Sequence, residues 1–73
     1  MTLKRAEAAR YIAEIFAEVG QEQVKEWKTE YQRGDGCFVY DHINGMIDTK
    51  TGKDYTGQYG QTRAILDELW WEG

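Results

Sequence analysis

Residues 37–49, CFVYDHINGMIDT, are the part of this chain whose conformation settles whether the protein contains a β-sheet. β-branched and aromatic side chains dominate the stretch, and such residues are enriched in strands. Asn44–Gly45 near its centre is the dipeptide most typical of a two-residue hairpin turn. The pattern therefore predicts a strand over residues 37–43, a turn at Asn44–Gly45 and a second strand over residues 46–49.

A third short strand can follow this hairpin. Residues 50–53, KTGK, contain a turn signal, and residues 53–56, KDYT, complete a small antiparallel meander. A tight turn at Asn44–Gly45 would place Asp41 opposite Asp48, and like charges in that position are unfavourable. The register therefore stays open between a tight turn and a looser loop.

Two helical segments precede the predicted hairpin. Over residues 3–19, apolar side chains recur at helical spacing on one stripe, namely Ala8, Ile12, Ile15, Phe16 and Val19. Gly20 stands where a glycine would end this helix, with Thr2 as the N-cap. Residues 21–33 form a second segment, with Val24, Trp27 and Tyr31 on a narrow face. Because the two stripes nearly connect, one long helix bent near Gly20 is the alternative to two helices.

A final helix is predicted over residues 61–71. Its apolar face consists of Ile65, Leu66, Leu69 and Trp70, and Trp71 falls outside that face. The predicted fold is a single α+β domain over residues 1–73, with two N-terminal helices, an antiparallel meander and a C-terminal helix.

The charge balance restricts the class of partner. Thirteen acidic residues face nine basic ones, which gives a formal net charge of −4. Proteins that bind nucleic acid directly rely on Lys and Arg to neutralise phosphates, so we expect a protein partner with a positively charged surface instead. The apolar runs are too short for an export signal or a membrane span, and cysteine is used once, so we expect a cytoplasmic protein.

No motif in the sequence predicts catalysis. A zinc site needs four nitrogen or sulfur ligands, and the chain has one cysteine, Cys37, and one histidine, His42. The TGKD stretch at residues 51–54 lacks the first glycine of a phosphate-binding loop and the hydroxyl residue after its lysine. We therefore expect no metal, no cofactor and no enzymatic activity.

Glutamates recur every four residues along the helical region, at Glu14, Glu18, Glu22, Glu26 and Glu30. On a continuous helix, successive members of this row would stand about 6 Å apart, close to the spacing of phosphates along a nucleic-acid strand. Such a row predicts a carboxylate surface for a basic groove, provided that the helix continues through Gly20. The alternative is an ordinary solvated helix face.

Ten aromatic residues are more than a core of this size can enclose. We expect Trp71, Tyr55 and Tyr59 to contact a partner, because Trp and Tyr are enriched at binding hot spots. Three acidic neighbours would favour an Arg- or Lys-bearing partner: Asp67, Glu68 and Glu72. The alternatives are that Trp71 covers its own core or pairs in a homodimer.

These features together predict a non-catalytic regulator that occupies a basic, nucleic-acid-binding site of a larger machine. In size, charge and lack of catalytic groups the chain resembles compact acidic inhibitors of phages and mobile elements, such as anti-CRISPR proteins and polymerase inhibitors. The resemblance is one of general character and carries over no residue. The alternatives are a structural subunit or adaptor, a homodimeric interaction module, or a small nucleic-acid-binding regulator that uses Lys4, Arg5 and Arg10.

Overall fold

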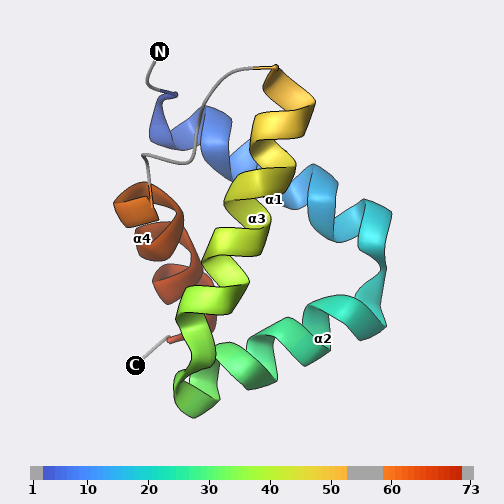
Figure 1. Ribbon diagram of the computed structural model, residues 1–73, viewed down its shortest axis with the longest axis vertical. Helices are drawn as coiled ribbons and strands as arrows, with labels where there is room; N and C mark the ends of the chain where they lie inside the picture. Colours follow the sequence, from blue (N-terminus) through green and yellow to red (C-terminus); the bar gives the residue numbers. More distant parts are fainter. Residues whose placement is uncertain (1–2, 53–58, 72–73) are drawn as a thin grey trace.

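The computed structural model describes residues 3–52 and 59–71, and every regular element in them is helical (Figure 1). A five-residue π-helical segment, η1, joins the second and third of the α-helices. The elements are α1 (Arg5–Val19), α2 (Gln21–Glu30), η1 (Tyr31–Asp35), α3 (Gly36–Thr51) and α4 (Tyr59–Trp70). Within the described residues there is no strand, so the predicted α+β class is wrong.

The largest correction concerns residues 36–51, which form α3 where the hairpin was predicted. Val39, Ile43 and Ile47 follow one another at intervals of four, and all three are at most 1% exposed. As one helix they present a single apolar side that packs against α1 and α4. A two-stranded hairpin in isolation is only marginally stable and would not offer such a side. Tertiary burial therefore overrides the local turn signal, and the predicted strand at residues 53–56 lies outside the described residues.

Gly20 separates the two N-terminal helices. Its φ of 92° lies in the region that glycine tolerates and other residues rarely adopt. The chain reverses there, and Figure 1 shows α2 turning back from the end of α1. The N-terminal part is therefore two helices, and α2 ends at Glu30, earlier than the predicted boundary at residue 33.

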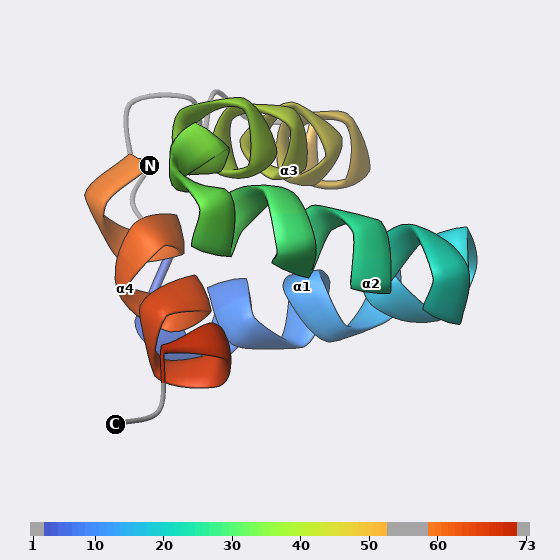
Figure 2. The ribbon, with the colours of Figure 1, turned by 90° about the horizontal axis from the view of Figure 1, so that it is seen from below.

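A second reversal lies within η1, at Gly34. Its φ of 113° interrupts the helical backbone, and α3 begins two residues later at Gly36. Figure 2 shows the resulting arrangement, with α3 and α1 on opposite sides, α2 along the front and α4 closing one end. The start of α3 thereby comes to lie beside the end of α4.

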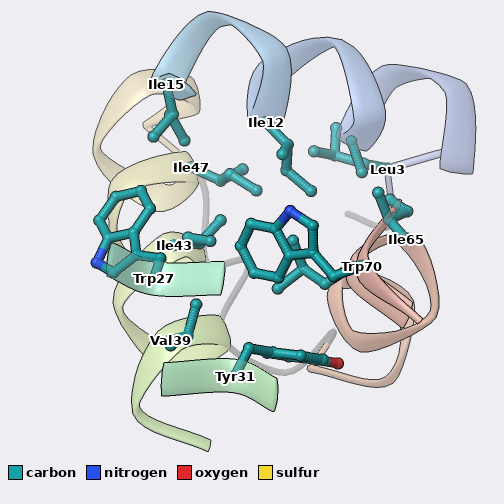
Figure 3. Close-up of a cluster of buried hydrophobic side chains, with 12 residues drawn as sticks. Leu3, Ile12, Ile15, Trp27, Tyr31, Val39, Ile43, Ile47, Ile65 and Trp70 are labelled. Carbon is teal, nitrogen blue, oxygen red and sulfur yellow. The ribbon is translucent and has the colours of Figure 1, made fainter. Parts of the chain in front are cut away.

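The core is built around α3 and is rich in rings (Figure 3). Trp70 is 7% exposed, stacks on Phe16 at a centroid distance of 5.7 Å and meets the Tyr31 ring edge-on at 5.3 Å. Trp27 packs against the same Phe16 ring at 6.2 Å. The buried hydrophobic residues are Leu3, Ala8, Ile12, Ile15, Trp27, Tyr31, Val39, Ile43, Ile47, Ile65, Leu66 and Trp70.

A fully buried polar pair crosses the core between α3 and α4. The Thr62 hydroxyl donates a hydrogen bond to Asn44 Oδ1, and neither residue is exposed. The asparagine of the predicted turn thus serves as an internal contact of the helix bundle.

Candidate interaction surface

The glutamate row does not form one continuous ladder. Glu14 and Glu18 belong to α1, whereas Glu22, Glu26 and Glu30 belong to α2, and the reversal at Gly20 separates the two groups. The unbroken helix on which the ladder depended is absent.

The α1 pair of the row is engaged inside the molecule. Lys50 on α3 reaches Glu18 at 2.5 Å and Glu14 at 3.7 Å. The hydrogen bond that Lys50 Nζ donates to Glu18, followed by the negative charges of both carboxylates, raises the pKa of Lys50. These two glutamates therefore connect α1 to α3 across the surface.

The α2 group lies on a shallow groove of mixed charge. Glu22, Glu26 and Glu30 line it together with Lys25 and Arg33. Within the described residues, no ion pair involves any of these three glutamates.

Trp71 follows directly after α4 and is 51% exposed. Its backbone N–H donates to the Asp67 carbonyl at 2.8 Å, and its ring lies 6.4 Å from the Tyr31 ring. One side of the indole is therefore supported by the protein while the other faces solvent. Its neighbour Trp70 points into the core. Of the two adjacent tryptophans, one is therefore buried and the other is available at the surface.

The most exposed large apolar residue among those described is Phe38, at 73%. The sequence prediction missed it, because a strand over residues 37–43 gave no reason to single it out. In α3 it lies about 140° around the helix from Ile43, at 100° per residue. The exposure of Phe38 could have been predicted from the helical spacing of Val39, Ile43 and Ile47.

Phe38 and Trp71 lie on two adjoining hollows that share Cys37 and Tyr40. The first hollow lies between η1, the start of α3 and the end of α4; the second lies beside Phe38. We call their combined lining the aromatic surface, which consists of Tyr31, Gly34, Gly36, Cys37, Phe38, Tyr40, Asp41, Arg63, Asp67 and Trp71.

Side chains from η1 fix the end of α4 beneath this surface. The Tyr31 hydroxyl donates to Asp67 Oδ1 at 2.6 Å and lies 3.3 Å from the Arg63 carbonyl. Gln32 Nε2 donates to the Trp70 carbonyl at 2.7 Å. Burial, followed by the hydrogen bond to Asp67, raises the pKa of Tyr31 well above its ordinary value. The phenol therefore stays neutral and keeps donating to Asp67. Together with the Gln32 hydrogen bond to Trp70, this contact holds the end of α4 from which Trp71 follows.

Two of the acidic residues predicted to surround Trp71 already have contacts within the chain. Asp67 accepts the Tyr31 hydrogen bond, and Glu68 forms an ion pair with Arg5. They are therefore less available to an outside cation than the sequence indicated. Tyr55, Glu72 and the side chain of Tyr59 lie outside the described residues.

A second apolar groove lies between α1, α2 and α4. Leu69, which is 50% exposed, is its most accessible large apolar side chain. The other lining residues are Ala9, Ile12, Ala13, Phe16, Val24, Lys28, Ile65 and Trp70. Of the two aromatic residues among these, Phe16 is half-buried and Trp70 is buried, so neither is exposed as Phe38 and Trp71 are on the aromatic surface.

Cys37 and His42 do not form a catalytic pair. They lie five residues apart on α3, about 140° around the helix. The His42 ring instead lies 5.8 Å from Trp27. In the part of the chain that the structure describes, no three metal-ligating side chains gather into a possible metal site.

The Tyr31 hydroxyl generates a pH-dependent prediction. We expect Tyr31→Phe to lower the free energy of unfolding by about 1–3 kcal/mol, because it removes a hydrogen bond to a carboxylate. Because the folded pKa is raised, this contribution is fully present below the ordinary tyrosine pKa of about 10 and decreases as the pH rises above it. Urea unfolding at a series of pH values measures both effects.

The matched control is Tyr11→Phe, whose ring lies beside Arg10 and not beside Asp67. The wild-type chain should lose more stability than Tyr31→Phe on going from about pH 9 to about pH 11. If the free energies of unfolding of the wild type and of Tyr31→Phe changed in parallel with pH, the Tyr31–Asp67 contact would not hold the end of α4.

Among the described helices, none is both long enough and apolar enough to cross a bilayer. Searches against protein-family models, curated proteins and solved structures give no match.

Proposed function

We propose that this chain is a non-catalytic protein-binding domain that contacts another chain through the aromatic surface. The observation that carries the proposal is the joint exposure of Phe38, at 73%, and Trp71, at 51%, on adjoining hollows. Exposed apolar groups that cluster in this way are typical of interaction sites, and large aromatic side chains supply much of the binding energy at such sites.

The rigidity of the surface supports the same function. Phe38 projects from α3, whose opposite side is buried, and Trp71 is held by the contacts of Tyr31 and Gln32 with α4. A preorganised surface loses less conformational entropy on binding than a flexible one. The two rings are therefore positioned to contact a partner without rearrangement of the fold.

The charges on this surface are mixed. Arg63 and Asp67 line the first hollow, where Asp67 accepts the Tyr31 hydrogen bond, and Asp41 lines the second. A partner that meets this surface would offer one group of each sign beside an apolar centre. Such a partner differs from the uniformly basic site that the overall charge of −4 favoured.

A second candidate function uses α2. Its row of Glu22, Glu26 and Glu30 is favoured by the lack of ion pairs from these glutamates to described residues. In this proposal the chain is an acidic regulator, and α2 occupies a basic, nucleic-acid-binding site of a larger machine. The row is shorter than the predicted ladder, and the positively charged Lys25 lines the same groove. This candidate function therefore ranks second.

The first proposal is tested by affinity capture with a tagged chain, including capture of co-expressed untagged copies. We expect Phe38→Ala and Trp71→Ala each to weaken retention of the bound chain by about thirtyfold, the effect typical of a hot spot. Leu69→Ala is the matched control, because it removes an exposed apolar side chain outside the aromatic surface. Equal retention by all four baits, or no retained chain at all, would rule out this function.

The acidic alternative is tested with the charge-removing pair Glu22→Gln and Glu26→Gln. If α2 binds a basic site, this double variant should lose at least about tenfold in affinity, and the wild-type complex should weaken as salt is raised. The control is Glu14→Gln with Glu68→Gln, which removes the same charge from α1 and α4. Equal loss in both variants would attribute the effect to net charge and contradict a site on α2.

A further inference from the structure

We propose that the occupant of the aromatic surface is a second copy of this chain. The two copies would be related by a twofold axis passing beside Cys37, so that Phe38 of each copy enters the first hollow of the other. The inference rests on the proposed function, because it names the partner of the same surface.

The shape of the surface favours this arrangement. Phe38 and the first hollow lie on either side of Cys37, which lines both hollows. Phe38 projects into solvent, and the first hollow has a volume of ≈ 280 Å³. Gly34 has open space around it, whereas Gly36 lets the Tyr31 ring pack closely against the start of α3. Trp71 forms a wall of the hollow against which a phenyl ring can pack. A twofold interface requires a projection and its matching recess on the same surface. Both are present here, side by side.

The charges are complementary under the same symmetry. Asp41 lies one helical turn after Phe38 and lines the second hollow with it. Arg63 lines the first hollow together with Asp67, whose carboxylate accepts the Tyr31 hydrogen bond. When Phe38 enters the opposite copy, Asp41 approaches the partner's Arg63, and the axis repeats the contact. Each chain carries a net charge of −4, so contacts of opposite sign are needed to offset the mutual repulsion of two copies.

The size of the surface indicates a weak dimer. A standard protein interface buries about 800 Å² per partner, which is about one sixth of the 4762 Å² that this chain exposes. The aromatic surface consists of ten residues, from η1, the first turns of α3, α4 from Arg63 onward and Trp71, whereas a standard interface has about 20–30 residues a side. We expect self-association in the micromolar range, the affinity typical of small transient interfaces.

Sedimentation equilibrium of the full chain under reducing conditions tests the proposal. The wild-type chain should dimerise, and Phe38→Ala should weaken the dimer by about thirtyfold without loss of fold, because this side chain is mostly solvated. Leu69→Ala should dimerise as the wild type does. Asp41→Arg should weaken the dimer, and Asp41→Arg combined with Arg63→Asp should restore it, because the pair is then reversed.

Mild oxidation provides a second measurement. An axis beside Cys37 brings the two exposed thiols together, so the wild-type chain should form a covalent dimer through Cys37. Phe38→Ala should slow this cross-linking. The control is Cys37→Ser with Ala17→Cys, which moves the thiol to an exposed position on α1 and should cross-link slowly.

The outcomes separate this inference from the proposed function. A chain that stays monomeric at the highest concentration, or a dimer disrupted by Leu69→Ala and not by Phe38→Ala, overturns the inference. If the monomeric chain still captures a different protein in a manner that requires Phe38 and Trp71, the binding function stands and only self-association is wrong. If no chain of either kind binds, both proposals fail.

Discussion

The fold depends on the burial of one side of α3. Val39, Ile43 and Ile47 are almost completely enclosed by α1 and α4, and burying a side chain of this kind contributes about 1.5–3 kcal/mol. Against this stands the cost of Gly45 in the middle of a helix, about 1 kcal/mol relative to alanine. The apolar contribution of three residues exceeds that cost, so the segment is helical although its most conspicuous dipeptide favours a turn.

The same constraint produces the aromatic surface. Once the apolar side of α3 faces the core, Phe38 on the opposite side must face solvent. The reversal at Gly34 carries the chain from α2 into α3, and it places Tyr31 where its hydroxyl reaches Asp67. Trp71 then lies across a hollow from Cys37. The exposed rings are thus a consequence of how the core is packed.

Helical spacing and glycine positions allowed part of this structure to be predicted from the sequence. The predicted segments at residues 3–19, 21–33 and 61–71 overlap α1, α2 and α4, and Gly20 marks the first reversal. The prediction was wrong for α3, because the local signals of Asn44–Gly45 and of the β-branched residues outweighed a spacing of four that was also present. Phe38 was missed as a direct result. The engagement of Asp67 by Tyr31 and of Glu68 by Arg5 joins residues 36 and 63 positions apart, and no local pattern reveals such contacts.

The substitution Gly45→Ala tests the helical state of residues 36–51 most directly. A Cβ at this position meets no other atom within 4 Å, so alanine fits without rearrangement. In a helix, the replacement should raise the free energy of unfolding by about 0.5–1 kcal/mol, as measured by urea denaturation. In a hairpin, Gly45 would need a positive φ, and alanine would destabilise the protein. A decrease in stability would therefore contradict the central role of α3.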